Sequence, residues 1–576
     1  MPDPPNAQIA SLFDELADLY ELDGAVVHRV MAYRNAAKAV RDAGTSVAAM
    51  TRAGQVTEMP GIGKTLEEKI TALLDTGTIP AVEKLRARFP PGLVDMTRLP
   101  GLGPKRARKL FDELGIDSLG ALKQAAEEQR LRGLRGFGPK FEEAMLTAFA
   151  AGVDETPRAR VLLSRALLIG DGIVEALRAH RASDRVELAG SARRMVDAVK
   201  DLDVVATATD PPALLRAFAA LDVIEQCSEP GENACRARTH TGMAVDFRVV
   251  EPDQFGNVLQ HLTGSKEHNV ALRERVVRKG LHVSEYGILD DADGKTHRCP
   301  TEEAVYAKLE LPWIPPELRE NRGELDLDAI PPLVEMADLR GDLHMHTVAS
   351  DGRNTIEQMA TAALERGYEY IAITDHSASH GFGNDVSPDE LRRQIECVRE
   401  ANAAIDGIEI LIGTESNIHT DGRLDYDDDL LAELDWVIAS VHTSFGVGSE
   451  QMTARVVAAC EHPSCDAIGH LTGRKIETRP PYAIDVDAVI EAAARTQTML
   501  EINSSADRRD LNDVHARAAA QAGVRILINS DAHGVNTLGI VRWGVATARR
   551  AWLGPDQVAN TLPWSEFAPL RRRVTG

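Results

Sequence analysis

The stretch that decides the fold of the central part of the chain reads RVELAGSARRMVDAVKDLDVVATA, residues 185–208. Within it, VELAG and DLDVVAT have the composition of β-strands. Asp201 and Asp203 are two residues apart, so an extended strand sends both carboxylates to the same face. A third β-rich run, MAVDFRVV, carries Asp246 and is able to lie beside the second. Three acids on one face repel each other unless divalent cations lie between them, which predicts a two-metal site that can hold a triphosphate, with Mg²⁺ or Mn²⁺ as the ions.

A phosphate-binding loop is predicted directly before the paired aspartates. Gly190 and Ser191 offer a closely approachable backbone and a hydroxyl, and Arg193 and Arg194 offer two guanidinium groups that suit phosphate oxygens.

Three similar segments occur in the first 150 residues: MPGIGKTLEEKI at 59, LPGLGPKRARKL at 99 and LRGFGPKFEEAM at 134. Each has a Gly-x-Gly turn followed by an amphipathic helix, whose free N–H groups suit an anion such as a DNA phosphate. The alternative is that the turns only join helices. The candidate DNA-binding residues are Gly61, Gly63, Gly101, Gly103, Gly136 and Gly138.

Histidines are concentrated in the last part of the chain, where 10 of the 17 lie after residue 340. After an acidic, proline-containing linker, strand-like runs end in DLHMHT, YIAITDH, EILIGTE, WVIASVH, AIGH, TMLEINSS and RILINSDAH. Seven such units alternating with helical stretches predict a barrel with functional residues at the carboxyl ends of the strands. Nine candidate ligands are too many for one ion, so two or three ions of manganese, zinc or iron are expected. The ligands are His344, His346, Asp351, His376, Glu415, His442, His470, Asp531 and His533.

With these motifs and HLTGSKEHNVALRERVVRKGLHVSEYGI at 261, residues 1 to about 320 resemble the family X DNA polymerases. Residues from about 335 onward resemble the PHP (polymerase and histidinol phosphatase) domain. The resemblance implies a multidomain fold with α-helical helix-hairpin-helix domains, an α+β nucleotidyltransferase palm, a small thumb-like domain and a C-terminal distorted (β/α)7 PHP barrel. The expected boundaries are 1–90 and 91–152 for two helical domains, 153–255 for the palm, 256–315 for the nascent-base-pair subdomain, 316–337 for a linker and 338–576 for the PHP domain.

The resemblance also implies activities and residue roles. Expected are gap-filling DNA synthesis in base excision repair and a metal-dependent 3′ to 5′ exonuclease in the PHP domain, with AP endonuclease activity as a further reaction of that domain. Asp201, Asp203 and Asp246 would be the catalytic metal ligands, and Glu415 would bridge two ions of the PHP cluster. The residues expected to bind the incoming nucleotide are Gly190, Ser191, Arg194, Thr263, Gly264, Ser265, Asn269 and Arg273.

Three places depart from the family pattern. The region between Arg194 and Asp201 lacks the family's usual Gly-x-x-Thr character. His261 and Leu262 stand where the family usually has a Tyr-Phe pair that helps to exclude a ribose 2′-hydroxyl. Lys69 falls on the position of a Schiff-base lysine that removes 5′-deoxyribose phosphate, but the basic neighbour expected four residues earlier is Thr65. An exposed helical lysine without chemistry is the alternative.

The net charge of -23 argues against a generic basic DNA-binding protein. Residues 1–150, however, hold 20 Lys and Arg against 20 Asp and Glu, whereas residues 341–576 hold 21 against 35, so the acidity is local. No apolar run is long enough for a membrane span, and six scattered cysteines predict reduced thiols. We expect a cytoplasmic monomer whose partners are gapped or primed double-stranded DNA and dNTPs. Two alternatives are a small-molecule phosphatase tethered to nucleic acid by a polymerase-like part, and a non-catalytic binding module.

Overall fold

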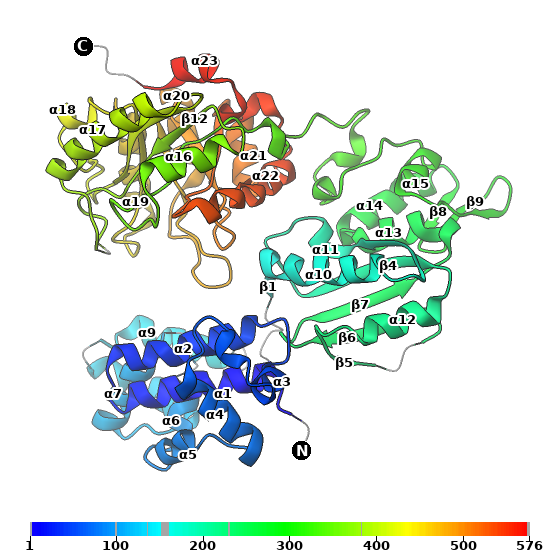
Figure 1. The fold of residues 1–576 in the computed structure, drawn as a ribbon, viewed down its shortest axis with the longest axis horizontal. Helices are drawn as coiled ribbons and strands as arrows, with labels where there is room; N and C mark the ends of the chain where they lie inside the picture. Colours follow the sequence, from blue (N-terminus) through cyan, green and yellow to red (C-terminus); the bar gives the residue numbers. More distant parts are fainter. Residues whose placement is uncertain are drawn as a thin grey trace. The chain divides into compact units, whose positions relative to one another are not determined.

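The computed structural model of the chain describes residues 3–97, 99, 101–134, 136–150, 160–228, 231–381 and 383–572 (Figure 1). Two compact units divide the chain. One comprises residues 1–161, 165–188 and 200–252, and the other comprises residues 162–164, 189–199 and 253–576.

The amino-terminal part of the first unit is helical. Its helices share one apolar core that contains Phe13, Ile70 and Leu110. The buried Asn6 joins two segments of this core, since its side chain accepts a hydrogen bond from Val47 N at 2.9 Å and donates to Thr45 O at 2.8 Å. The helices are α1 (Asn6–Leu22), α2 (Val27–Asp42), α3 (Val47–Arg52), α4 (Lys64–Thr76), α5 (Pro80–Arg86), α6 (Pro91–Met96), α7 (Pro104–Leu114), α8 (Leu119–Glu127) and α9 (Pro139–Ala150), with short 3-10 turns η1 (Val56–Glu58) and η2 (Leu131–Gly133).

The rest of the first unit is a five-stranded mixed sheet with the strand order β2-β4-β7-β6-β5. In β7, burial alternates, and Phe247 packs against Phe218 of α12 with ring centroids 4.8 Å apart. This alternation leaves the opposite face of the sheet for polar side chains. The elements of residues 161–249 are β1 (Val161–Leu162), α10 (Leu163–Arg178), β2 (Ser183–Leu188), α11 (Gly190–Arg193), β3 (Ala198–Val199), β4 (Asp201–Ala208), α12 (Pro211–Ala219), β5 (Ile224–Cys227), β6 (Ala234–Thr239) and β7 (Ala244–Val249). Of these, α11 and β3 lie in residues 189–199, which belong to the second unit.

A disulfide joins Cys227 of β5 to Cys235 of β6. The expectation that all thiols are reduced was therefore wrong for this pair, because strand pairing brings together two cysteines that composition alone treats as scattered. The other four cysteines are free.

The second unit begins with a small α+β region. Its core is formed by Leu272, Ile288, Tyr306 and neighbouring apolar side chains. Its elements are η3 (Pro252–Gln254), α13 (Phe255–Thr263), α14 (Lys266–Val277), β8 (Leu281–Ser284), β9 (Gly287–Asp290), β10 (Lys295–His297) and α15 (Glu302–Lys308), followed by the 3-10 turns η4 (Pro316–Leu318), η5 (Glu324–Asp326) and η6 (Met336–Asp338).

The predicted barrel is confirmed: seven parallel strands follow one another in chain order from β11 to β17. A parallel bridge between Met345 and Ala532 joins the two ends of the sheet, and His346 N donates to Ala532 O at 2.8 Å. The strands are β11 (Gly341–Asp342), β12 (Tyr370–Ile373), β13 (Glu409–Asn417), β14 (Trp436–Ser440), β15 (Ala467–Ile468), β16 (Met499–Asn503) and β17 (Ile526–Asn529).

Helices surround this barrel. Successive side chains of a strand point alternately toward the helices and toward the barrel interior, so each strand contributes to two apolar cores. In β12, Ile371 and Ile373 pack against the helices, whereas Tyr370 and Ala372 face the interior. The helices are α16 (Ile356–Leu364), α17 (Pro388–Ala404), α18 (Asp428–Leu431), α19 (Ser449–Glu461), α20 (Val486–Thr496), α21 (Asp513–Gln521), α22 (Val541–Arg550) and α23 (Trp564–Phe567), with 3-10 turns η7 (Val535–Ile540), η8 (Pro555–Gln557), η9 (Ala559–Thr561) and η10 (Ala568–Leu570).

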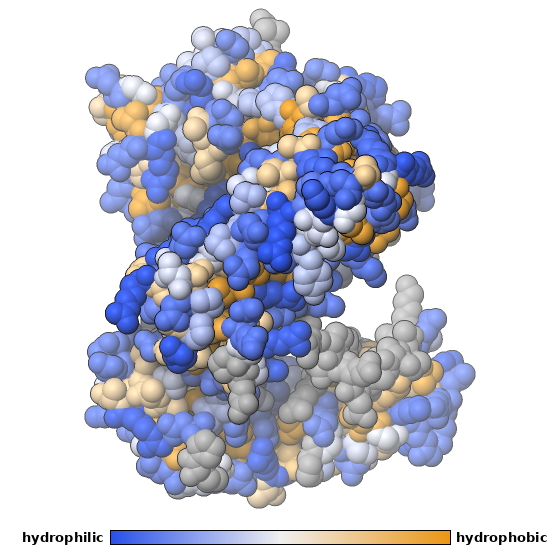
Figure 2. Space-filling model, turned by 90° about the vertical axis from the view of Figure 1, so that its right-hand side faces the viewer, coloured by the Kyte–Doolittle hydropathy of each residue, from blue (hydrophilic) through white to orange (hydrophobic). Residues whose placement is uncertain are grey.

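Hydrophilic residues dominate the face drawn in Figure 2, with hydrophobic residues scattered among them. Among the described helices, none is long and apolar enough to cross a membrane.

Candidate active sites

The three aspartates of the central sheet lie on one face of two neighbouring parallel strands. In the pairing of β4 with β7, Asp203 lies opposite Asp246, and Asp201 lies two residues before Asp203 on the same strand. Asp201 is exposed, while Asp203 and Asp246 are half-buried. Arg236 of β6 lies beside them, with its Nε 3.4 Å from a carboxylate oxygen of Asp246. The donor set therefore suits hard divalent cations, although the catalytic role of the trio remains a prediction.

The loop that precedes these aspartates in the sequence belongs to the second unit, where other residues of that unit hold it. Arg193 donates to both carboxylate oxygens of the buried Glu302, at 2.8 and 2.7 Å. Arg194 donates to Thr263 O at 2.5 Å and to Glu320 at 3.1 Å. Gly190 has φ +65°, a conformation that favours glycine. The structure therefore brings Arg194 to the Thr263-Gly264-Ser265 turn, two motifs that the sequence predicted for one ligand.

The buried Glu302 is held as a carboxylate. Burial would raise its pKa, but the Arg319 guanidinium and the hydrogen bonds from Arg193 lower it to about 2. Arg193 is therefore paired with a buried carboxylate, and Arg194 is paired with Glu320.

The other predicted nucleotide-binding residues lie at the start of α14. Ser265 caps this helix by accepting a hydrogen bond from His268 N at 3.1 Å. Asn269 donates to His261 O at 2.8 Å, and Arg273 lies 3.3 Å from Nδ1 of His261. The unusual His261 therefore sits among the predicted nucleotide-binding side chains rather than away from them.

The three Gly-x-Gly turns adopt similar conformations. Gly61, Gly101 and Gly136 have φ values of +87°, +77° and +97°. A side chain added at any of the six turn glycines would meet no atom within 4 Å, so the backbone there is accessible. Gly63 and Gly103 are the N-cap residues of α4 and α7, as anion binding at a helix start requires.

Lys69 lies half-buried on α4, and its lyase role stays a prediction.

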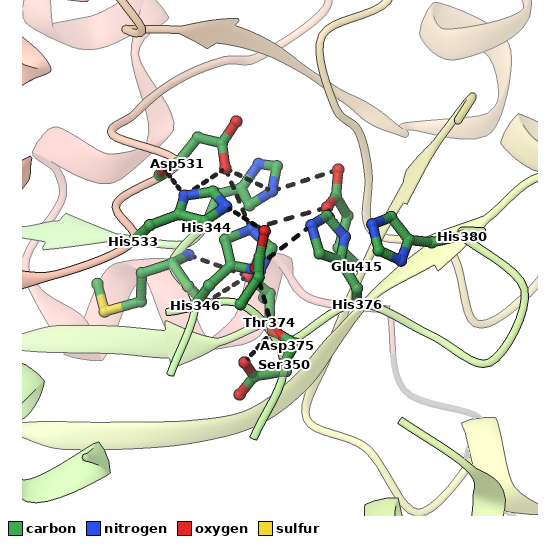
Figure 3. Close-up of polar contacts among 12 residues, drawn as sticks. His344, His346, Ser350, Thr374, Asp375, His376, His380, Glu415, Asp531 and His533 are labelled. Atoms are coloured by element: carbon green, nitrogen blue, oxygen red, sulfur yellow. Dashed lines mark hydrogen bonds and ion pairs between the residues drawn. The ribbon is translucent and has the colours of Figure 1, made fainter. Parts of the chain in front are cut away.

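All nine predicted ligands of the barrel lie at or just after the carboxyl ends of its strands. Figure 3 labels six of them, His344, His346, His376, Glu415, Asp531 and His533. Glu415 is central. Its Oε1 lies 3.0 Å from Nε2 of His470, 3.2 Å from Nε2 of His442 and 3.4 Å from Nε2 of His344, and its Oε2 lies 2.8 Å from Nδ1 of His376. Glu415 reaches this place because it shares the inward-facing register of β13 with Leu411.

The remaining ligands form two further groups beside Glu415. His346, Asp351, His376 and His533 offer ligand atoms within 4.8 Å of one another, as do His344, His346 and Asp531. His376, Glu415 and His442 form a third group. The three groups overlap, which matches a cluster of two or three ions.

Unsatisfied buried atoms show that the donor set fits metal ions. Both oxygens of Glu415, Nε2 of His344 and both ring nitrogens of His442 are buried and, apart from close approaches among the cluster residues themselves, make no hydrogen bond in the described part of the chain. Leaving such groups unpaired in a protein interior is costly, whereas metal coordination would satisfy them. Imidazole and carboxylate together suit manganese, zinc or iron.

The acids and histidines of the cluster shift each other's pKa values. Burial would raise the pKa of Glu415, but His442, His344 and His376 hold it well below its ordinary value. Burial would lower the pKa of His344, but the carboxylates of Glu501, Glu415 and Asp531 raise it well above its ordinary value. Burial lowers the pKa of His442 to about 4, so this imidazole is neutral, as a ligand must be.

Sequence reasoning missed Glu501, which lies in the middle of β16 (Met499–Asn503), the one barrel strand for which no ligand was assigned. Its Oε1 accepts a hydrogen bond from Nδ1 of His344 at 2.7 Å, and its Oε2 accepts one from His470 N at 2.8 Å. Its neighbour Asn503 donates to Asp531 at 3.0 Å. These contacts fix the orientation of the ligands. The run TMLEINSS contained the signal, an acid at an inward-facing position of a strand.

His380 is a further histidine at this site, outside the nine predicted ligands. The structure buries it against the cluster, where its ring stacks on that of His376 with centroids 3.9 Å apart and an interplanar angle of 6° (Figure 3). Its Nδ1 contacts Asp385. His419, by contrast, pairs with Asp425 at 2.6 Å and belongs to no described metal group.

Comparison with known proteins adds independent information about each part of the chain. Four family models match: a helix-hairpin-helix domain over residues 4–79, a SAM-like helix-hairpin-helix tandem over 93–150, the DNA polymerase beta thumb over 258–320 and the PHP domain over 342–505.

Relatives match either nearly the whole chain or a part of it. The protein named DNA polymerase/3′-5′ exonuclease PolX of Bacillus subtilis is 38% identical over 570 residues, which cover 98% of this chain and 99% of that protein. A probable phosphatase of Shewanella sediminis is 31% identical over 40% of this chain and 94% of its own length. The probable phosphatase YcdX of Escherichia coli O139:H28 is 31% identical over 38% of this chain and 90% of its own length.

Proposed function

Because the chain belongs to the bacterial-type family X DNA polymerases with a C-terminal PHP domain, we propose that it fills short gaps in DNA and trims 3′ ends. Gap filling is assigned to the central sheet with the thumb, and trimming to the barrel. The cellular role that fits this pair of activities is base excision repair in the cytoplasm, by a monomer acting on gapped or primed duplex with dNTPs.

The observation that carries the polymerase assignment is the pairing of Asp203 with Asp246, with Asp201 two residues away on the same face. Bound there, two Mg²⁺ or Mn²⁺ ions would lower the pKa of the primer 3′-hydroxyl and neutralise the triphosphate. The aspartates hold the charge that attracts these ions. Arg194 and the Thr263-Gly264-Ser265 turn orient the incoming nucleotide, while Asn269 and Arg273 approach its base pair.

The three glycine turns bind the backbone of the duplex without reading its sequence. Their helix starts present backbone N–H groups, and the segment that carries them is electrically neutral. DNA is therefore held locally by a protein that is acidic elsewhere.

In the barrel, nine side chains would hold two or three ions of manganese, zinc or iron, with Glu415 as a bridge. When bound, these ions supply Lewis-acid activation of water and of the scissile phosphodiester. The chain's own contribution is to fix the ligands: Glu501 orients His344, and Asn503 orients Asp531. Cleavage at abasic sites is a further reaction of the same centre.

The similarity of the barrel to probable phosphatases favours a second candidate, hydrolysis of a small phosphate monoester. In that case the polymerase-like part would only tether the barrel to nucleic acid. Substrate separates the two: turnover of histidinol phosphate without trimming of DNA 3′ ends supports the phosphatase.

The decisive experiment compares Asp203→Ala with His344→Ala on a one-nucleotide gapped duplex with Mn²⁺. Asp203→Ala is expected to abolish extension and leave trimming, and His344→Ala to do the reverse. Each variant is the control for the folding of the other. Loss of both activities in either variant contradicts the assignment of two separate sites.

A further inference from the structure

Arginines of the PHP barrel form hydrogen bonds and ion pairs with the predicted phosphate-binding loop of the polymerase part. Residues 189–199, which contain Gly190, Ser191 and Arg194, belong to the same compact unit as residues 253–576. Three arginines from three different loops or helices of the barrel make this contact: Arg474, Arg509 and Arg550.

The first contact is with the carboxylate of Asp197. Nη1 of Arg474 donates to its carboxylate at 2.8 Å, and Nη1 of Arg509 lies 3.3 Å from the other oxygen. The side chain of Arg509 is only 1% exposed, and it also donates to Met195 O at 2.9 Å. Met195 has φ +57°, a strained conformation for a residue with a side chain, so a contact that holds its carbonyl helps to maintain the turn.

The second contact is with Arg194 itself. Arg550 of α22 donates to Arg194 O at 2.7 Å and to Glu320 at 2.8 Å. Glu320 also accepts from Nε of Arg194. Backbone and side chain of this predicted phosphate ligand are thus both fixed through Arg550.

These arginines are connected to the metal-binding end of the barrel. Arg474 lies four residues after His470 and donates to Arg509 O at 2.5 Å. Between them, Thr472 N donates to the carboxylate of Asp510, and His470 N donates to Glu501. The same two loops that carry or support a predicted metal ligand therefore also hold the polymerase loop.

Buried guanidinium groups are costly unless they are paired, so three of them directed at one short loop require an explanation. We propose that Arg474, Arg509 and Arg550 are positioning residues for nucleotide binding: the PHP domain preorganises the Gly190–Arg194 loop for the triphosphate. The inference rests on the proposed polymerase function, and it makes the barrel a structural part of the polymerase site as well as a hydrolase.

The test is a double-mutant cycle in the full-length protein with Asp197→Asn, Arg474→Gln and the double variant. Steady-state gap filling would give KM for the dNTP and kcat separately. We expect each single change to raise KM about 5- to 10-fold with kcat changed less, which corresponds to loss of one partly buried charged contact. The double variant should be no worse than the worse single variant, because both remove the same interaction.

Controls separate this role from a general loss of structure. Asp253→Asn removes an exposed contact to Arg298 and should leave KM unchanged. Asp197→Glu, which keeps the charge, should restore much of the affinity, and 3′-end trimming by Asp197→Asn should match wild type.

The outcomes are distinguishable. A wild-type protein that does not extend a primer overturns the proposed function. A wild-type protein that extends, with unchanged KM in Asp197→Asn or with single effects that add in the double variant, overturns the inference alone.

Discussion

The two sites of this protein are built in opposite ways. The sheet site is a trio of aspartates on two adjacent strands, one exposed and two half-buried. The barrel site gathers eight side chains, from strand ends and one loop, around Glu415, whose side chain is 1% exposed. The first is open and purely carboxylate, and the second is enclosed and rich in imidazole.

The difference indicates when each site acquires its ions. An open group of three acids leaves coordination positions for a triphosphate and for water, so its ions are expected to arrive with the nucleotide. A buried set with unsatisfied nitrogens and oxygens needs its ions for its own stability. The barrel ions should therefore be resident, and the sheet ions transient.

The largest expected effect is on the sheet site. Asp246→Asn should lower gap filling by more than about 100-fold, since supporting residues alone are worth about 10- to 100-fold at metal sites. The measurement is single-nucleotide extension on gapped duplex. Asp184→Asn is the control, because Asp184 only accepts a hydrogen bond from Thr207 at the far end of β4. Extension near the wild-type rate in Asp246→Asn would remove this acid from the site.

A smaller effect is expected from a change beside the barrel ligands. Glu501→Gln should lower metal affinity and 3′-end trimming about 10- to 100-fold. Each oxygen of the Glu501 carboxylate accepts from two donors, from His344 and Asn529 at one and from His470 and Asn503 at the other, so an amide NH₂ in place of either oxygen faces two donors. Chelator competition measures the affinity without relying on activity. Glu491→Gln on the exposed face of α20 is the control, and equal metal affinity in both variants would contradict the role of Glu501.

Metal content tests the contrast directly. After dialysis without added metal, the wild-type protein and Asp203→Ala should retain manganese, zinc or iron in stoichiometric amount, and His344→Ala should retain less. Elemental analysis of the three proteins checks this. Retained metal that disappears with Asp203→Ala would reverse the assignment of resident ions to the barrel.

The smallest effect concerns DNA affinity. If only the glycine turns of the neutral segment meet the phosphates, log K for gapped duplex should fall with log salt with a slope of about -3. Fluorescence anisotropy between 50 and 200 mM salt, as rough limits, covers the sensitive range. A slope near -10, roughly that of a broad basic groove, would show that DNA contacts extend well beyond the turns.

Local sequence patterns were sufficient for much of this architecture. Strand-like runs that end in His, Asp or Glu predicted the barrel and its ligands, because parallel strands in a barrel bring their carboxyl ends to one rim. The spacing of Asp201 and Asp203 predicted a shared face, because strand side chains alternate. The repeated Gly-x-Gly turns predicted helix starts, because glycine tolerates positive φ.

What the sequence could not supply are contacts between distant segments. Glu501 meets His344 across 157 positions, and Arg550 meets Arg194 across 356. The disulfide between Cys227 and Cys235 likewise depends on how two strands pair. The sequence by itself determined which side chains stand at the ends of which elements, since that depends on neighbours along the chain. Only the tertiary structure decided which of them orient the metal ligands and which contact the predicted phosphate-binding loop, because packing brings those partners together from distant parts of the sequence.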